Sequence, residues 1–366
     1  MIIYHHAKPI IQEAAVGAAL RPLRLLDAMR EVGEEVIEIT GPGPARVKKA
    51  ARIPAVLPED AVFYSESVVV PPALTWIRRR PWRMNFDYNL IRNLHRRGVP
   101  TGLFYRDIYW VLEETKAVSL RSFIRHRLTP AFARRELKHY EKSLNVLFLP
   151  HKNMMDHVPG SFPDTEIRTL PPGGELRELS RGGNREEGRL NLLYVGNIAP
   201  PHYDLRPYIK AMDEISCATM DVITRENALA HHGELYKFDE RTNVTVSHAH
   251  GEGLHPFYGR ADLALAVRDD NEYLAFAMPV KIFEAISFGV PLVVSAGLKV
   301  VAELVKRENL GWVVESPQGF HELLRHLADS PAELEAARAR VVAARERHSW
   351  KARARKILEV LRNARG

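Results

Sequence analysis

The sequence predicts an α/β protein built from two consecutive Rossmann-like domains. Short apolar runs alternate with helical patterns in two successive series, which is typical of parallel sheets covered by helices on both faces. A stretch at 171–184, which contains Pro-Pro-Gly-Gly and Arg-Gly-Gly-Asn, separates the two series. The 366 residues also exceed the length at which a single hydrophobic core is common, so two domains are expected.

The first series occupies the N-terminal half. A helical pattern over Pro22–Val32 ends at Gly33, a residue that commonly closes helices. The predicted strands are short apolar runs: Met1–Tyr4, Val36–Ile39, Ala61–Tyr64, Thr101–Phe104 and Asn145–Leu149. We therefore predict an N-terminal domain over 1–175.

The second series begins after the Pro- and Gly-rich stretch. A helix with proline in its first turn is predicted over Pro279–Phe288, and the stretch Pro331–Leu361 has a strongly helical composition. The predicted strands are again apolar runs: Leu190–Val195, Met220–Ile223, Asn243–Val246, Leu263–Val267 and Pro291–Val294. They indicate a second domain over 186–345, followed by a final helix over 346–366.

The composition bounds the compartment. Cys217 is the single cysteine, which excludes an intrachain disulfide and a four-thiolate zinc site and fits a reducing cytoplasm. The start of the chain has no signal-peptide pattern, and no run of 18 apolar residues occurs. A cytoplasmic protein is expected, with a peripheral position at the inner face of the membrane as a further option.

The excess positive charge lies in the N-terminal half. Residues 1–183 contain 28 Lys and Arg against 20 Asp and Glu, whereas the remainder contains 24 against 25. Such asymmetry favours an anionic partner, namely a lipid surface, a polyphosphate carrier or a nucleic acid. The alternative is a basic surface without a specific partner.

Residues 119–142 form a basic segment with interleaved apolar side chains. The segment has a net charge of +5, and a helix of this kind can lie on an anionic membrane surface. Pro130 is expected to interrupt the helix. Two ordinary surface helices that pack an apolar face are the alternative, and the sequence leaves both open.

The most informative segment is Met278–Val294, which reads as a short helix that feeds a buried strand. The start of this helix offers free backbone N–H groups and a partial positive charge, as a diphosphate site needs. Lys281 can neutralise phosphate, and Glu284, one turn later, can accept hydrogen bonds from two hydroxyls such as those of a ribose. The alternative is an i,i+3 ion pair on a solvated helix.

This segment resembles the donor-binding motif of GT-B glycosyltransferases, especially retaining family four. The matching residues, in order and spacing, are Pro279, Lys281, Phe283, Glu284, Gly289 and Pro291. Leu192–Ile198 resembles the strand and glycine turn that open the donor domain of that fold, with Gly196 and Asn197 at the turn. Ser349-Trp350 resembles the element that leads a last helix back to the first domain. The resemblance implies two Rossmann-like domains that face a cleft, and a nucleotide-diphosphate sugar, UDP-sugar foremost, as the donor.

The sequence departs from the family-four pattern at three positions. Where the family has the first glutamate of a Glu-x7-Glu pair, this chain has Phe276, and the nearby Glu272 is out of register. The arginine and lysine that usually follow the opening glycine are replaced by Asn197 and His202. Arg225, after the strand that ends at Thr224, is a substitute cation, because ligands lie at the carboxyl ends of such strands. A surface arginine at a turn is the alternative.

Candidate catalytic residues follow the strands of the first domain. Arg106-Asp107 stand where the family commonly has His-Asp, and Asp107 could act as a base on the acceptor hydroxyl. A buried Arg-Asp pair that orders a loop is the alternative. His5-His6 follow the first strand, and His6 is a further candidate, although isolated histidines are more often structural.

Together these features predict a hexosyltransferase-like glycosyltransferase with no metal and no cofactor. The pair Asp269-Asp270 reads as a solvated turn rather than as a metal site. We expect a glycan or lipid-linked acceptor, as in cell-surface polysaccharide or glycolipid synthesis. A nucleotide-sugar epimerase on the same fold is the main alternative. A nucleic-acid-binding module is disfavoured because the chain lacks helix-turn-helix and repeated aromatic binding patterns.

Overall fold

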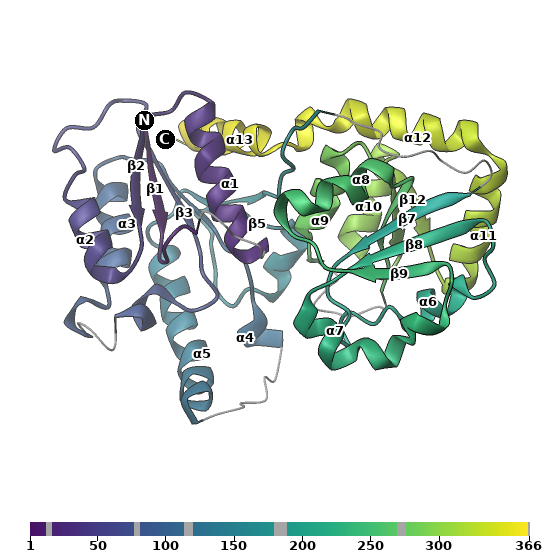
Figure 1. Ribbon diagram of the computed structural model, residues 1–366. Helices are drawn as coiled ribbons and strands as arrows, with labels where there is room; N and C mark the ends of the chain where they lie inside the picture. The colour runs from purple at the N-terminus through teal and green to yellow at the C-terminus, as the bar shows by residue number, and fades with distance from the viewer. Residues whose placement is uncertain (12–16, 77–80, 113–119, 179–188, 269–275, 365–366) are drawn as a thin grey trace. The chain divides into compact units, whose positions relative to one another are not determined.

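The computed structural model describes the chain except for residues 12–16, 77–80, 113–119, 179–188, 269–275 and 365–366 (Figure 1). The chain divides into two compact units. The first unit contains Met1–Pro171 together with Trp350–Gly366, and the second unit is Pro172–Ser349. Each unit contains a six-stranded parallel sheet, which confirms the predicted α/β class and the two Rossmann-like halves.

The sheet of the first unit has the strand order β2-β1-β3-β4-β5-β6. Its strands are β1 (Ile2–His6), β2 (Val36–Thr40), β3 (Val62–Glu66), β4 (Thr101–Phe104), β5 (Val146–Leu149) and β6 (Glu166–Thr169). Its helices are α1 (Gly17–Glu31), α2 (Gly43–Ala50), α3 (Phe86–Arg96), α4 (Tyr109–Leu112), α5 (Leu120–Tyr140) and α13 (Trp350–Asn363). Strands β1, β3, β4 and β5 are buried along their whole length, which explains why apolar runs marked them in the sequence.

The sheet of the second unit has the order β12-β11-β10-β7-β8-β9. Its strands are β7 (Leu190–Val195), β8 (Ala218–Ile223), β9 (Val244–Ser247), β10 (Leu263–Ala266), β11 (Leu292–Ser295) and β12 (Gly311–Val314). Its helices are α6 (Arg206–Met212), α7 (Glu226–His232), α8 (His255–Arg260), α9 (Val280–Ser287), α10 (Lys299–Glu308), α11 (Pro317–Asp329) and α12 (Pro331–Ala344).

Both sheets have a topological switch point, where the chain leaves the first strand in one direction and later returns to its other side. The point lies between β1 and β3 in the first unit and between β7 and β10 in the second. Ligands of open parallel sheets bind at the carboxyl ends of the strands at such points. The fold therefore directs attention to the residues that follow these four strands.

The last helix, α13, belongs to the first unit although it ends the chain. It packs on α1 and β3 (Figure 1). Gly102 of β4 makes room for it, because a Cβ atom there would lie 2.7 Å from Leu361 Cδ2 and 3.0 Å from Phe148 Cε2.

One sequence expectation about helices is confirmed and one is wrong. The stretch Pro331–Leu361 is helical, as its composition predicted: α12 and α13 are separated by a 3-10 turn at Glu346–His348 and by Ser349, which is extended and bridges to Gly174. The expected break at Pro130 is absent, since helix α5 runs through it without interruption. Proline removes one backbone donor, and the contacts of α5 with α3 and α4 hold the helix despite that loss.

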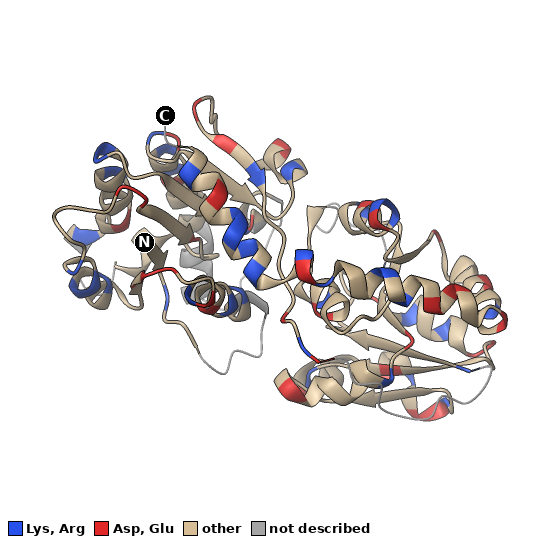
Figure 2. Ribbon diagram, turned by 90° about the horizontal axis from the view of Figure 1, so that it is seen from above, with Lys and Arg blue, Asp and Glu red and all other residues tan. Residues whose placement is uncertain are grey.

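The division into units makes the charge asymmetry larger than the sequence halves indicated. The first unit contains 32 Lys and Arg against 19 Asp and Glu, a net charge of +13. The second unit contains 20 against 26, a net charge of −6. Both signs occur on the helices of each unit (Figure 2). None of the described helices is both long and apolar enough to cross a bilayer.

Candidate functional site

A pocket of about 160 Å³ lies at the switch point of the second unit. Its walls come from the ends of β7 and β10 and from the first turn of α9. Among the residues that line this switch-point pocket are Gly196, Asn197, Tyr203, Tyr258, Arg268, Pro279 and Lys281. Four of the six donor-site residues predicted from the sequence, namely Gly196, Asn197, Pro279 and Lys281, are thus brought together.

The turn after β7 is shaped by hydrogen bonds of Asn197 and Tyr194. The Asn197 side-chain oxygen accepts from the backbone N–H of Ile198 at 2.9 Å, and the Tyr194 hydroxyl donates to the Asn197 carbonyl at 2.6 Å. A side chain at Gly196 would be pressed against Tyr194, because its Cβ would lie 3.0 Å from the phenol oxygen. Glycine here lets the backbone come close to whatever occupies the pocket.

Helix α9 begins at the pocket. Pro279 precedes it in an extended conformation and offers no side-chain cap, so the first N–H groups of the helix are left for a ligand or water. Lys281 Nζ lies 2.6 Å from Glu284 Oε2, so the ion pair considered as the alternative is present. Glu284 also accepts from the Tyr258 hydroxyl at 3.2 Å, and Tyr258 lines the pocket. Glu284 therefore contacts two residues that line the pocket, Lys281 and Tyr258.

Arg225 is placed differently from the other predicted donor residues. It is exposed, precedes α7 and does not line the switch-point pocket. Within the described part of the chain its side chain has no hydrogen-bond or ion-pair partner. Its proposed role as a phosphate cation stays a prediction.

Sequence reasoning missed Arg268 and Tyr203, which also line the pocket. Arg268 follows β10, and its guanidinium lies 5.0 Å from the centroid of the Tyr203 ring. Burial raises the pKa of Tyr194 to about 12, although the nearby Arg268 acts in the opposite direction. Its signal in the sequence is its position directly after the predicted strand Leu263–Val267.

At the switch point of the first unit, His6 ends β1 and lies beside Glu66 at the end of β3. His6 Nδ1 is 3.0 Å from the Glu66 carbonyl oxygen, so this nitrogen carries the proton and Nε2 keeps its lone pair. Burial lowers the pKa of His6 to about 4, and Lys8 and Arg106 act in the same direction. His6 is therefore neutral at pH 7, and its Nε2 can accept a hydrogen bond.

The other two predicted catalytic residues follow the next strand, β4. The Arg106 backbone N–H donates to Ser67 Oγ at 2.9 Å, which ties the end of β4 to the end of β3. The side chains of Arg106 and Asp107 are half-buried. The structure thus places His6, Arg106 and Asp107 at the carboxyl ends of β1 and β4, on either side of β3.

A buried polar cluster supports this edge of the sheet, and only the polar run Ser65-Glu66-Ser67 indicates it in the sequence. The Glu66 carboxylate accepts from Arg21 Nε at 3.1 Å and from the Tyr64 hydroxyl at 2.5 Å. The Arg21 guanidinium lies 3.5 Å from the centroid of the Phe104 ring. The cluster fixes the backbone whose carbonyl holds His6.

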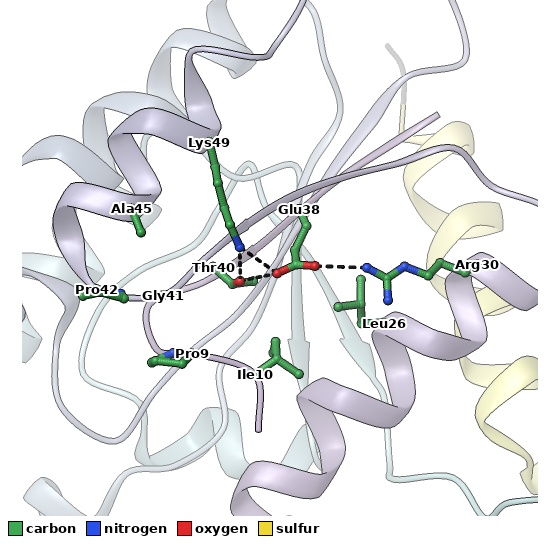
Figure 3. A pocket seen from close by; sticks show the side chains of 10 residues that line it. All are labelled: Pro9, Ile10, Leu26, Arg30, Glu38, Thr40, Gly41, Pro42, Ala45 and Lys49. Carbon is green, nitrogen blue, oxygen red and sulfur yellow. Dashed lines mark hydrogen bonds and ion pairs between the residues drawn. The ribbon is translucent and has the colours of Figure 1, made fainter. Parts of the chain in front are cut away.

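Another pocket, of about 320 Å³, belongs to the first unit and lies at its edge strand β2 (Figure 3). Glu38 stands in its centre and accepts from Lys49 Nζ at 2.8 Å and from Arg30 Nη2 at 3.0 Å, while Thr40 also donates to it. Glu38 is the single carboxylate among the described residues that line this pocket and is paired with both of their cations, Arg30 and Lys49, and the pocket lies at the edge strand of the sheet. It carries no assignment.

Among the described residues there is no group of three or more His, Cys, Asp or Glu side chains that could hold a metal ion. Asp269, Asp270 and Glu272 lie outside the described residues. Phe276, which stands where family four has a glutamate, is buried.

Comparison with known proteins places these sites in context. Residues 217–359 match the family described as "Glycosyl transferase-like". No curated protein matches the sequence. Among solved structures, HepE from Anabaena, in complex with UDP and glucose, is similar over 99% of this chain and 100% of that chain, with a TM-score of 0.61 and 11% identity.

Two further solved structures have the same architecture. The trehalose-6-phosphate synthase OtsA is similar over 98% of both chains, with a TM-score of 0.57 and 12% identity. The UDP-forming trehalose-phosphate synthase from Burkholderia xenovorans, in complex with glucose-6-phosphate, covers 86% of this chain and is covered over 75% of its own, with a TM-score of 0.51 and 14% identity. The chain thus carries a glycosyl transferase-like domain over residues 217–359 and has the GT-B glycosyltransferase fold, as the sequence predicted.

Proposed function

We propose that the protein transfers a sugar from a nucleoside-diphosphate sugar, with a UDP-sugar as the favoured donor, to a hydroxyl of a sugar acceptor. The observation that carries the proposal is the switch-point pocket of the second unit, which joins the glycine turn at Gly196 to the start of α9 and Lys281. The helix start and Lys281 lie within residues 217–359, which match the glycosyl transferase-like family. The fold supports it, since similar structures were solved with UDP and glucose or are described as UDP-forming.

We assign roles to the donor-site residues on chemical grounds. The backbone at Gly196 and Asn197 and the start of α9 after Pro279 would meet the diphosphate through N–H groups. Lys281 would add positive charge, and Glu284 would accept hydrogen bonds from the ribose hydroxyls. Helix dipole and cations together would stabilise the departing diphosphate. Arg225 remains a further candidate for the phosphates.

On the acceptor side, His6, Arg106 and Asp107 are the proposed catalytic residues. Asp107 offers a carboxylate that can accept the proton of an acceptor hydroxyl. His6 is neutral at pH 7 with a lone pair on Nε2, so it can accept a hydrogen bond from that hydroxyl and orient it. Arg106 would bind an anionic group of the acceptor.

Replacing Glu284 by alanine is expected to weaken UDP binding by about 5- to 150-fold, because the ribose hydroxyls would lose a charged acceptor worth roughly 1–3 kcal/mol. Titration calorimetry with UDP measures the change. Glu303→Ala is the matched control, since Glu303 is a 59% exposed glutamate on helix α10 of the same unit. Unchanged UDP affinity in Glu284→Ala would reduce Glu284 to a partner of Lys281.

We further propose that the first unit associates with an anionic membrane surface at the inner face of the cytoplasmic membrane, where a lipid-linked glycan acceptor would be found. Its net charge of +13 supports this. So does Trp82, which is 77% exposed beside Arg83, since indole rings favour the membrane interface. The side chains of 120–127 in the basic segment lie outside the described residues.

Association with vesicles is expected to rise with the fraction of anionic lipid and to fall as salt is added. In a sedimentation assay, Trp82→Ala should reduce the bound fraction, whereas Val56→Ala, at an 85% exposed site of the same unit, should not. Equal sedimentation with neutral and anionic vesicles would contradict membrane association and leave the donor proposal untouched.

The epimerase alternative shares the donor site but needs no acceptor. Product formation that requires an added acceptor supports the transferase, and an epimerised nucleotide sugar formed without acceptor supports the alternative. We do not propose a nucleic-acid partner.

A further inference from the structure

Arg268 stands at the switch point of the second unit, in register with the glycine turn. Leu265 of β10 pairs with Tyr194 of β7, and Arg268 and Asn197 each follow by three residues. The two positions therefore leave the sheet side by side, at the carboxyl ends of adjacent parallel strands. Both residues line the switch-point pocket.

The backbone of Arg268 is fixed from the neighbouring strand β11. Its N–H donates to Ser295 Oγ at 3.1 Å, and the same hydroxyl donates to its carbonyl at 2.8 Å. The guanidinium lies 5.0 Å from the Tyr203 ring centroid, a distance at which the ring attracts the cation. These contacts hold the side chain in place before any ligand arrives.

The guanidinium of Arg268 has unused hydrogen-bonding capacity. Its Nε atom is buried and has no hydrogen-bond partner within the described part of the chain. Arg268 forms no ion pair with any carboxylate among the described residues. Lys281, the other cation of the pocket, is paired with Glu284 at 2.6 Å. A buried N–H donor without a partner is unfavourable, so an anionic acceptor that enters the pocket would gain from it.

The charge of the unit makes a local cation necessary. The second unit has a net charge of −6, so its overall field opposes an anionic ligand. The positions that carry the arginine and lysine in family four are Asn197 and His202 in this chain. Lys281 is already paired with Glu284, so by itself it is a weak counterion for a diphosphate.

We infer that Arg268 binds the diphosphate of the donor and supplies, from the end of β10, the positive charge that the turn after β7 lacks. A planar guanidinium can donate two parallel hydrogen bonds to phosphate oxygens. Charge that builds up on the leaving diphosphate during transfer strengthens these bonds. The inference rests on the proposed function, and it assigns to Arg268 the substitute-cation role that the sequence suggested for Arg225.

The test compares UDP with uridine in binding to the wild-type protein, Arg268→Gln, Arg268→Lys and the control Arg307→Gln. Arg307 is a 59% exposed arginine of helix α10, outside the pocket. Arg268→Gln is expected to weaken UDP about 10- to 100-fold while the affinity for uridine stays within twofold, because only the phosphates lose a charged donor. Arg307→Gln should bind both ligands like the wild type.

Arg268→Lys keeps the charge without the paired donors, so it should weaken UDP by a smaller factor. If Arg268→Gln does not fold, Arg268→Lys alone tests whether the guanidinium contributes to UDP affinity. UDP affinity unchanged in Arg268→Lys and in folded Arg268→Gln would overturn the role of Arg268 alone. A parallel loss of uridine affinity would also overturn it, because the residue would then shape the whole pocket. If the wild-type protein binds neither ligand nor any other nucleoside diphosphate, the proposed function fails as well.

Discussion

Replacing Asp87 by alanine is expected to lower the free energy of unfolding of the first unit by about 3–5 kcal/mol, because it leaves a buried cation without its partner. Asp87 is 1% exposed, and Arg46, which it binds, is fully buried. Arg46 Nε donates to Asp87 Oδ1 at 2.7 Å and Nη2 to Oδ2 at 2.8 Å. Removal of one member of such a pair costs far more than an exposed ion pair contributes.

Asp87 has two further partners that would lose their acceptor. His5 Nε2 lies 3.0 Å from Oδ1, and Trp76 Nε1 donates to Oδ2 at 3.0 Å. Burial alone would raise the pKa of Asp87, but the hydrogen bonds from His5 and Arg46 outweigh it and hold the pKa well below its usual range. The carboxylate is therefore charged in the folded protein, and all four hydrogen bonds depend on it.

Urea unfolding followed by tryptophan fluorescence measures this effect. Four of the five tryptophans belong to the first unit, and Trp76 itself contacts Asp87. Glu59→Ala, at an exposed position of the same unit, is the control and should change stability little. Asp87→Asn should lie between the wild type and Asp87→Ala, since it keeps the volume but loses the charge. A loss below about 1 kcal/mol in Asp87→Ala would show that the network contributes no more than a surface ion pair.

Glu136→Gln is expected to stabilise the first unit at pH 8 and to leave its stability nearly unchanged at pH 4. Glu136 on α5 is 2% exposed, and burial raises the pKa of its carboxyl from 4.5 to about 8. The Tyr140 hydroxyl donates to it at 2.6 Å, which opposes the shift, while the nearby Asp87 reinforces it. The folded protein therefore keeps the proton at pH values where the unfolded chain has lost it.

The sign of the pH dependence follows from this difference. Below about pH 4.5 both states hold the proton, and the carboxyl imposes no penalty. Between pH 4.5 and about 8 the free energy of unfolding of the wild type falls by up to about 1.4 kcal/mol per pH unit from this group. Glutamine cannot ionise, so the variant escapes that loss, and its advantage should grow to several kcal/mol at pH 8.

Urea midpoints at pH 4, 6 and 8 for the wild type, Glu136→Gln and the exposed control Glu59→Gln give the measurement. Only the difference between Glu136→Gln and the wild type should widen with pH. If the stability difference between Glu136→Gln and the wild type did not change with pH, the account would be contradicted. The Glu136 carboxyl would then ionise in the folded protein as readily as in the unfolded chain.

The fold could be predicted because its core strands are apolar on both faces. Strands β1, β5 and β10 each appear as a short apolar run in the sequence, and buried parallel strands require such runs. Strand β6 escaped notice because Glu166–Thr169 is mostly exposed and polar, so periodicity gave no signal. The sequence did not predict that α5 continues through Pro130, because proline has a low helix propensity. Packing against neighbouring helices stabilises α5 there, and that packing cannot be seen in the local sequence.

The candidate site was predicted in part for a similar reason. A helix start with Pro279 and Lys281 is a local feature, legible in one stretch of sequence. Arg268 and Glu66 have meaning only through strand order, because the switch point between β7 and β10, or between β1 and β3, joins segments far apart in the chain. Arg225 looked equivalent to Arg268 in the sequence, since each follows a strand, but it is outside the pocket.

The most direct test of sugar transfer is to incubate the wild-type protein with labelled nucleotide sugars and a panel of sugar, sugar-phosphate and lipid-linked acceptors. Nucleoside diphosphate and labelled product are both quantified. We predict that at least one donor, a UDP-sugar foremost, yields nucleoside diphosphate and glycosylated acceptor in equal amounts, and only when acceptor is present. Conversion of the donor to an epimer without acceptor, or no binding and no turnover of any nucleotide sugar in the panel, would contradict the account.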